Sequence, residues 1–296
     1  MRRLYLSLIT LLAVVMLVVA PAQAAIDSRV AFRRLWERTD LPIDKQVVAR
    51  SWTWGGLVSS IVLGTPVQQE PYAEAPGGQR DVLYFDKARM EINDPSADPS
   101  LSWFITNGLL PIEMMTGQIQ IGYTQFEAHS PAKISAIGDP NHWPTYADLL
   151  PYYQSPGQVN TSDLGKPATG MINRDGTITG FNDYVNDGGT ILVRGENNHG
   201  VAKVFIDFMN QQGLVYVDGR YVREQLYDPL FVFGLPVTGA YWVKTQVGGV
   251  ERPILFQVFE RRVLTYNPAN PPNWRVEMGN VGQHYYQWRH VQGPDR

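Results

Sequence analysis

Two glutamates are the residues of this chain that could do acid–base chemistry on a sugar. Glu91 and Glu277 lie in two similar stretches of sequence, and each stands opposite a threonine when those stretches are aligned. A glycoside hydrolase needs two carboxyl groups, one kept protonated by its surroundings and one ionised. If the two stretches pack face to face, Glu91 and Glu277 could form such a pair. The alternative is that both are solvent-facing strand glutamates, since Glu is rarely buried.

His199 is the third candidate for acid–base chemistry, because it stands before an expected helix start. An imidazole titrates near neutral pH, so His199 could be a general base. It could equally be a capping residue in a turn. The remaining histidines lack metal-binding spacing, since the sequence contains neither His-x-His nor His-Glu-x-x-His. We therefore expect no metal site and no cofactor.

Motifs of other enzyme classes are missing from the sequence. It contains no Gly-x-Ser-x-Gly, no Ser-x-x-Lys and no phosphate-binding loop, which argues against a serine hydrolase, a kinase or a dinucleotide enzyme. It contains no cysteine, which excludes a thiol nucleophile, a thiolate metal site and any disulfide. The stretch 173–176 imitates part of a calcium loop, but Met171 and Asn182 would fill ligand positions. We interpret it as a β-turn.

Aromatic side chains are the candidates for binding a ligand. Trp52 and Trp54 lie on either side of Thr53 in an expected strand, so both indoles would point to the same face. A pair of indoles could stack a sugar ring, whereas the alternative is that most of these rings lie in the core. The candidate ligand-binding residues are Trp52, Trp54, Tyr72, Trp103, Tyr241 and Trp242, and Trp274 belongs to the same aromatic group.

The elements that position these residues occur twice in the chain. Residues 82–93 match residues 256–267, and each copy reads as a β-strand that runs into an Asn and Pro turn. The charged pairs in both copies predict cross-strand ion pairs. The aligned residues are Phe85 with Phe259, Asp86 with Glu260, Lys87 with Arg261, Met90 with Leu264, and Asn93 with Asn267.

Further blocks match in the same order on both sides of these strands. Each copy starts with the apolar edge of a short helix, continues through a Gly-x-Pro-Val turn, and ends in a segment with Trp and Gly five residues apart. The matched blocks are 32–36 with 205–209, 63–68 with 233–238, and 103–108 with 274–279.

The sequence therefore predicts a β-rich α+β fold with an internal duplication. Each of two similar units would combine a helix with an antiparallel hairpin, with the units at residues 25–117 and 201–296. A Pro- and Gly-rich bridge at residues 118–200, possible site of a degenerate third unit, would join them. In the second unit we expect the helix to run from Val201 to Gln212 and to stop at Gly213.

The second unit carries a recognisable pattern. Phe-Gly-x-Pro-Val-Thr at 233–238, Phe-Glu-Arg-Arg-Val-Leu-Thr-Tyr-Asn-Pro at 259–268 and Trp-x-Val-Glu-Met-Gly-Asn-Val-Gly at 274–282 resemble a family of secreted bacterial repeat modules. That family is distantly reminiscent of the LGFP repeats of envelope proteins. The resemblance implies an extracytoplasmic module of mixed α and β structure, and it carries no agreed catalytic residue.

The first 24 residues have the form of a secretory signal peptide. Arg2 and Arg3 precede an apolar run from Leu4 to Ala20, and Ala22-Gln23-Ala24 provides a cleavage site. An uncleaved membrane anchor is the alternative, because the apolar run is nearly long enough to span a bilayer. The whole chain has a net charge of −3, and cleavage would make it more negative. We therefore expect neither nucleic acid nor an anionic membrane surface as a partner.

These observations favour a secreted, non-catalytic module that binds cell-envelope or extracellular polysaccharide. The alternative is a secreted carbohydrate-active hydrolase that uses carboxylates between the two units. The sequence names no particular ligand and no oligomeric state.

Overall fold

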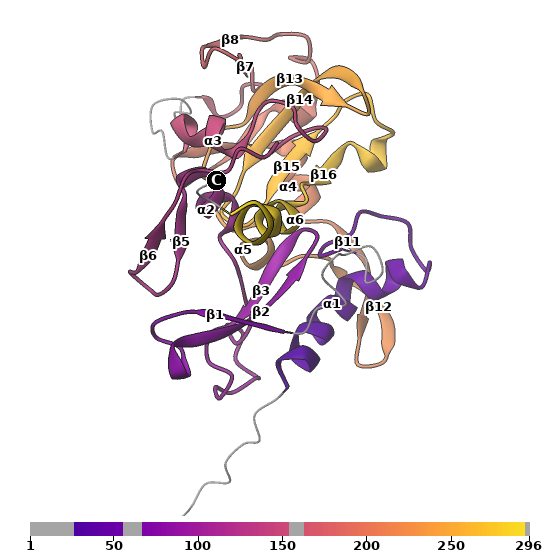
Figure 1. The fold of residues 1–296 in the computed structure, drawn as a ribbon. Helices are drawn as coiled ribbons and strands as arrows, with labels where there is room; N and C mark the ends of the chain where they lie inside the picture. Colours follow the sequence, from indigo (N-terminus) through magenta and orange to yellow (C-terminus); the bar gives the residue numbers. More distant parts are fainter. Residues whose placement is uncertain (1–26, 56–66, 154–162, 294–296) are drawn as a thin grey trace, which may run out of the picture.

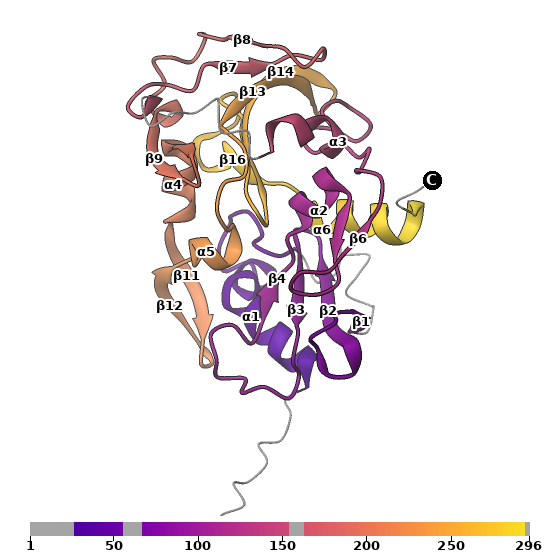
Figure 2. The ribbon, with the colours of Figure 1, turned by 90° about the vertical axis from the view of Figure 1, so that its left-hand side faces the viewer.

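The computed structural model describes residues 27–55, 67–153 and 163–293 as a mixed α+β fold, as the sequence predicts. The expected signal peptide lies outside these residues, as do residues 63–66 of the first Gly-x-Pro-Val turn. One four-stranded sheet and one six-stranded sheet lie at opposite ends of the molecule, and helices α2 (Leu110–Thr116) and α6 (Val281–Tyr286) lie between them (Figures 1 and 2).

The smaller sheet is an antiparallel meander in chain order. Its core is the hairpin of β2 and β3, which pairs Val82 with Glu91 and Phe85 with Ala88. The strands in order across the sheet are β1 (Gln68–Pro71), β2 (Gln79–Phe85), β3 (Ala88–Ile92) and β4 (Thr106–Asn107).

The larger sheet contains a second antiparallel meander of four strands. A fifth strand pairs in parallel with its first strand through Trp242 and Met171, and a sixth extends the edge. The order across the sheet is β16 (Val276–Met278), β15 (Val263–Tyr266), β14 (Val250–Val258), β13 (Tyr241–Val247), β7 (Gly170–Ile172) and β8 (Ile178–Gly180).

The two meanders repeat the same backbone pairings at aligned positions. Met90 pairs with Asn107 in the smaller sheet, and Leu264 pairs with Met278 in the larger one. Two pairs of backbone hydrogen bonds also correspond between the copies. In the first pair, Gly108 N donates to Arg89 O and Gly279 N donates to Val263 O, each at 2.9 Å. In the second pair, Lys87 N donates to Trp54 O at 2.9 Å and Arg261 N donates to Phe233 O at 3.0 Å.

The stretch between the two predicted units is more than a connector, because it supplies strands β7 and β8 to the larger sheet. The turn at residues 173–176 is closed by a 2.9 Å bond from Gly176 N to Asn173 O, as a β-turn requires. The other elements of this stretch are β5 (Gln118–Gln120), β6 (Phe126–Ala128), α3 (Tyr146–Leu149) and β9 (Leu192–Glu196), with short 3-10 turns at Leu150–Tyr152 and Gly188–Thr190.

Helix α1 (Ser28–Asp44) carries the first predicted apolar edge, and its Phe32 and Trp36 are buried one turn apart. Asp27 caps its N-terminus by accepting a hydrogen bond from Arg29 N at 2.8 Å. Both views show α1 beside the hairpin of β11 (Gln212–Val217) and β12 (Arg220–Gln225) (Figures 1 and 2).

The second predicted helix is shorter than expected. Helix α4 spans Lys203–Met209, because His199–Ala202 forms strand β10 against β9 and Gln212 already begins β11. Gly213 therefore lies in a strand rather than at a helix end. Helix α5 (Pro229–Val232) follows the β11–β12 hairpin.

The two predicted units share their hydrophobic core. Alternate residues of a strand point to opposite faces, and in β2 this places Phe85 in one buried cluster and Val82 in the other. Phe259 joins the cluster of Phe85, and Val258 joins the cluster of Val82. Both sheets are therefore covered on both faces, which stabilises the chain as one body without disulfides.

Helix α6 crosses from the end of the larger sheet to the hairpin of the smaller one. At Gly282 a Cβ atom would lie 1.9 Å from Phe85 O, so the helix packs directly on the β2–β3 backbone. Gln283 extends this contact, since its backbone N donates to Asp86 O at 3.0 Å and its Nε2 to Asp86 Oδ1 at 2.7 Å. The chain continues as a π-helical turn at Gln287–Gln292.

Candidate functional site

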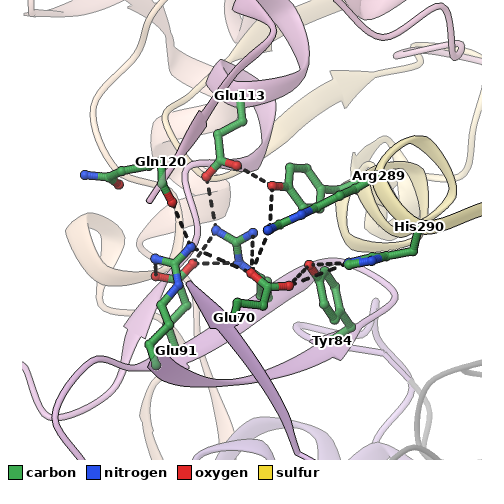
Figure 3. Close-up of polar contacts among 10 residues, drawn as sticks. Glu70, Tyr84, Glu91, Glu113, Gln120, Arg289 and His290 are labelled. Atoms are coloured by element: carbon green, nitrogen blue, oxygen red, sulfur yellow. Dashed lines mark hydrogen bonds and ion pairs between the residues drawn. The ribbon is translucent and has the colours of Figure 1, made fainter. Parts of the chain in front are cut away.

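Glu91, the first predicted catalytic carboxylate, lies in a buried network of charges (Figure 3). Its Oε2 accepts a hydrogen bond from Arg80 Nη1 at 2.9 Å, and its Oε1 accepts one from Arg89 Nε at 2.7 Å. The network contains three carboxylates and three guanidinium groups, from Glu70, Glu91, Glu113, Arg80, Arg89 and Arg289.

Arg89 is the centre of this network and contacts all three carboxylates. Its Nη2 lies 3.1 Å from Glu113 Oε1, and its Nη1 lies 3.4 Å from Glu70 Oε2. Glu113 also accepts a hydrogen bond from the Tyr285 hydroxyl. Although burial disfavours its charge, the carboxylate of Glu91 leads the neighbouring groups that raise the pKa of Arg89.

Glu70 connects the network to the C-terminal turn. It accepts hydrogen bonds from the Tyr84 hydroxyl at 2.6 Å and from Arg289 Nη1 at 2.7 Å. Burial favours the neutral acid, but Arg89, a hydrogen bond from His290 and the charge of Arg289 together hold the pKa of Glu70 well below its usual range.

This network holds the molecule together and leaves Glu91 no access to a substrate. The Glu91 residue is 5% exposed and Glu113 is 2% exposed. A general acid must reach the leaving group of its substrate. Glu91, buried and hydrogen-bonded to two guanidinium groups, does not meet this condition.

A pocket of about 440 Å³ lies where the two sheets meet, and two predicted site residues, Glu277 and Trp52, line it. Its walls come from the loop after α1, the β2–β3 turn, the β13–β14 hairpin, β15, β16, α6 and a segment of the predicted bridge. The lining residues are Arg50, Ser51, Trp52, Lys87, Ala136, Ile137, Gly138, Asp139, Val247, Ile254, Thr265, Asn267, Trp274, Glu277, Met278, Gly279, Asn280 and His284.

Two indoles line this pocket. Trp52 is partly buried against the core, and Trp274 is 39% exposed. The loop that carries Trp52 is fixed by buried Asp40, whose carboxylate accepts the backbone N–H groups of Thr53, Trp54 and Gly55 at 3.0, 2.8 and 3.1 Å. The ring of Trp52 is therefore presented by a rigid backbone.

Lys87 brings a positive charge from the smaller sheet to the pocket. Its Nζ donates to Met278 O at 2.6 Å and to Asn280 Oδ1 at 2.9 Å. Burial, followed by the repulsion of Arg262, lowers the pKa of Lys87 to about 8. The lysine is thus charged at neutral pH, but only by a narrow margin.

Glu277, the second predicted catalytic carboxylate, lines the same pocket. Its side chain is exposed at the rim, yet desolvation by the surrounding walls raises its pKa against the opposing charge of Lys87. Asp139 is a second carboxylate of the lining, and the backbone N–H groups of Gly249 and Gly248 lower its pKa by donating to it at 2.7 and 2.9 Å.

His284 is neutral at physiological pH. Burial and then the charge of Lys87 lower its pKa to about 4. Its Nδ1 lies 3.0 Å from the Tyr146 hydroxyl, which orients the ring.

The structure separates the remaining predicted site residues from this pocket. His199 is buried in β10 rather than in a turn, its Nδ1 has no hydrogen-bond partner, and burial lowers its pKa. Trp54, Tyr241, Trp242 and Tyr72 are core residues, with exposures of 1%, 4%, 0% and 4%.

The expected strand around Thr53 is also absent. Residues 51–55 form a bend instead, which buries Thr53 completely and separates the environments of Trp52 and Trp54. Trp103 is 68% exposed on the surface and lines none of the described pockets. Of the six predicted ligand-binding aromatics, the pocket includes Trp52.

Several residues of the pocket were not predicted from the sequence. Arg50 and Asn280 carry no motif, and Asp139 comes from the stretch that was interpreted as a bridge. Lys87 did carry a signal, because it occupies the repeated acid–base position. It was expected in a cross-strand ion pair, whereas it bonds to a carbonyl and an amide oxygen.

The described residues contain no group of three or more His, Asp or Glu side chains that could hold a metal ion. Within the same residues, no helix is both long enough and apolar enough to cross a membrane. No family model, curated protein or solved structure matches the chain.

Proposed function

We propose that this chain is a secreted, non-catalytic module that binds cell-envelope or extracellular polysaccharide in the pocket between its two sheets. The observation that carries the proposal is the meeting of two indoles and several hydrogen-bonding side chains in one pocket of about 440 Å³. Protein sites for small ligands combine apolar walls with a few polar groups in this way.

The lining matches the two kinds of surface on a sugar. The apolar face of a pyranose ring can stack on Trp52 or Trp274, and its hydroxyl groups can bond to Thr265, Asn280 and Glu277. The pocket volume is large enough for one or two sugar rings, within the range of about 300–1,000 Å³ seen for ligand sites.

The location outside the cytoplasm is inferred from the N-terminal sequence. A basic start, an apolar run and the small residues Ala22 and Ala24 together favour export and cleavage before residue 25. A location outside the cytoplasm would give the pocket access to polysaccharides outside the cell. N-terminal sequencing of protein recovered from the culture medium should start at Ala25; an intact Met1 on membrane-bound protein would contradict export with cleavage.

Binding without turnover is the decisive property. Residues 25–296 would be run through native gels that contain one polysaccharide each, and the same polysaccharides would be analysed for released reducing sugar. We expect retardation by at least one polysaccharide and no product. Absence of retardation across neutral and acidic polysaccharides would overturn the proposed function.

A second candidate, a carbohydrate-active hydrolase, is favoured by one observation. Glu277 and Asp139 line the same pocket, and their surroundings move the two pKa values in opposite directions. Acid and base carboxylates of glycosidases differ in this way. In this candidate mechanism Asp139, rather than Glu91, is the partner of Glu277, because Glu91 is hydrogen-bonded to Arg80 and Arg89.

The hydrolase candidate is tested with Glu277→Gln. Reproducible release of product by the unmodified chain that disappears in Glu277→Gln would establish the enzyme. The matched control is Glu251→Gln, which changes an exposed strand glutamate outside the pocket. If product release is lost in both variants or in neither, Glu277 is not the catalytic acid.

We also infer that the two meanders arose by internal duplication. Support comes from the aligned strand pairings and from the paired hydrogen bonds at Lys87 and Arg261. By these hydrogen bonds the counterpart of Gly234 is Gly55, since the residues before them, Phe233 and Trp54, accept those bonds. The matched sequence blocks instead put Gly64, which lies outside the described residues, opposite Gly234.

If the two glycines are equivalent, substitution by alanine should destabilise the protein at both positions for the same reason, a positive φ and a close contact of the added Cβ. Gly55 has φ +134° and Gly234 has φ +75°, and an added Cβ would lie 2.7 Å from Asp86 Cβ and 2.5 Å from Glu260 Oε2 respectively. We expect Ala at either position to lower the free energy of unfolding by about 1–3 kcal/mol in urea denaturation. Gly77→Ala, with φ +70° and open space around it, is the control for backbone strain alone and should cost less. A tolerated change at only one of the two positions would argue against their equivalence.

A further inference from the structure

Two cations line the pocket without a carboxylate partner. Lys87 Nζ bonds to one backbone carbonyl and one amide oxygen, and Arg50 bonds to the backbone carbonyls of Leu214 and Thr39 at 2.8 and 2.6 Å. Neither forms an ion pair with any described residue. In the buried network of the same molecule, by contrast, every arginine faces a glutamate.

Both cations retain unused hydrogen-bond donors. An ammonium group has three N–H bonds, and Lys87 uses two of them on protein oxygens. A guanidinium group has five, and Arg50 uses one N–H on each of Nη1 and Nη2, which leaves a second N–H on each of these atoms. Desolvated donors without partners cost free energy unless a ligand or water satisfies them.

The cations are held in place before any ligand arrives. Arg50 and Trp52 belong to the loop that Asp40 fixes through three backbone N–H groups. Lys87 N donates to Trp54 O at 2.9 Å, which ties the β2–β3 turn to this loop. An indole and two positive charges therefore have a constant relative arrangement, which reduces the ordering cost of binding.

We propose that the pocket recognises a polysaccharide unit that carries a carboxylate, with Lys87 and Arg50 binding the carboxylate and Trp52 supporting the sugar ring. This inference rests on the proposed function and narrows its ligand to acidic sugars such as uronates. Charge-assisted hydrogen bonds from lysine and arginine are the strongest available to a carboxylate. Glu277, on the same lining, would then accept from sugar hydroxyl groups.

The direct test compares an acidic oligosaccharide with its neutral form. Residues 25–296 would be titrated calorimetrically with an oligogalacturonate and with its full methyl ester, which keeps the rings and hydroxyl groups but removes the charge. We expect the acidic form to bind at least about tenfold more tightly, the equivalent of one charge-assisted hydrogen bond. This comparison needs no variant, so it stands even if a substitution impairs folding.

Two variants then test which residues recognise the carboxylate charge. Lys87→Met and Arg50→Met should each remove most of the preference for the acid form while leaving affinity for the methyl ester within about threefold of the unmodified chain. Lys166→Met is the matched control, since that lysine is 64% exposed and lines no part of the pocket. It should leave both affinities unchanged.

The outcomes separate this inference from the proposed function. Equal affinity for acid and ester, or an acid preference that survives both Lys87→Met and Arg50→Met, would overturn carboxylate recognition and leave polysaccharide binding standing. Binding of neither form, with no other polysaccharide bound, would overturn both. A short peptide with a free C-terminal carboxylate is included, and tighter binding to that peptide than to the oligogalacturonate would overturn the assignment to an acidic sugar.

Discussion

Lys87 shows how one repeated turn position can take different partners in the two copies. In the second copy the aligned residue is Arg261, which forms an ion pair with neighbouring Glu260 at 3.1 Å. Lys87 instead reaches across to β16 and bonds to Met278 O. The same repeated position therefore stabilises a turn in one sheet and lines a pocket in the other.

If the pocket binds a carboxylate as proposed, the charge of Lys87 makes that binding depend on pH. A lysine with a lowered pKa is protonated below that pKa and loses its charge as the pH rises through it. Affinity for an acidic oligosaccharide should therefore be constant well below pH 8, the pH near which Lys87 is half protonated, and should fall as the pH rises through that value. The charged groups that act on Lys87 are Arg262, Asp86, Glu277 and Asp40, and Lys87 in turn acts on His284.

Lys87→Arg is the control for this pH dependence. Arginine keeps its charge throughout the accessible pH range, so the variant should bind with an affinity that does not fall between pH 7 and about 9.5. Calorimetric titrations at half-unit intervals would measure both profiles. A fall of equal size in Lys87→Arg would assign the pH dependence to another group.

Arg89 is the residue on which the buried network depends. Removing it leaves Glu91, Glu113 and Glu70 in a closed interior with fewer positive charges. Breaking a buried ion pair from one side costs about 3–5 kcal/mol, so Arg89→Met should lower the free energy of unfolding by that amount in urea denaturation.

Arg33→Met provides the matched control on an exposed pair. Arg33 contacts Glu37 at 2.9 Å, but its side chain is 68% exposed. Such pairs contribute about 0–1 kcal/mol. An equal effect of the two substitutions would contradict a structural role for the network.

The network also explains why Glu91 has a structural place rather than a catalytic one. Residues 82–93 were expected to form a strand, and Glu91 was a catalytic candidate because a threonine stands opposite it in the second copy. All five residues of β3 are buried, because Arg89 and Glu91 satisfy each other and their neighbours. Those neighbours come from β1, α2 and the C-terminal turn, and their approach is a tertiary property that no local pattern contains.

At the scale of elements, β structure was predictable from the sequence, but the positions of its turns were not. Residues 82–93 and 256–267 were each expected to form one strand, but a turn divides each stretch: β2 ends at Phe85 and β3 begins at Ala88, and β14 ends at Val258 and β15 begins at Val263. The segment around Thr53 reads as a strand, but Asp40 captures its backbone N–H groups and bends it. The helix expected from Val201 starts later, since His199–Ala202 finds a strand partner in β9.

Helix α6 depends on one glycine for its docking. Alanine normally stabilises a helix relative to glycine by about 1 kcal/mol. At Gly282, however, a Cβ would lie 1.9 Å from Phe85 O and 2.7 Å from Ala88 N, both backbone atoms. Gly282→Ala should therefore lower the melting temperature by several degrees, equivalent to about 1–3 kcal/mol.

The control for Gly282 is Gly188→Ala in a 3-10 turn, where no atom lies within 4 Å of the added Cβ. We expect little change in its melting temperature. If Gly282→Ala is as stable as the unmodified chain, α6 does not pack on the hairpin as described.

At the scale of the whole molecule, the pocket exists because the two sheets share one body. Its walls combine Lys87 from the smaller sheet, Glu277 from the larger one and Asp139 from the stretch between them. The sequence indicated two similar units, but neither their shared core nor the strands that the intervening stretch adds to the larger sheet could be predicted. The shared core depends on packing between residues more than one hundred positions apart, such as Phe85 and Phe259, and the added strands depend on the pairing of Met171 with Trp242, 71 positions apart.

The equivalent tryptophans of the two meanders test the central claim, that polysaccharide binds in this pocket. Trp274 lines the pocket and is 39% exposed, whereas aligned Trp103 is 68% exposed and lies outside it. Because neither indole is fully buried, Trp274→Ala and Trp103→Ala should both fold with little loss of stability. The measurement is retardation in polysaccharide-containing native gels. We predict that Trp274→Ala loses the retardation and Trp103→Ala keeps it, whereas retention in Trp274→Ala together with loss in Trp103→Ala would contradict binding in the pocket.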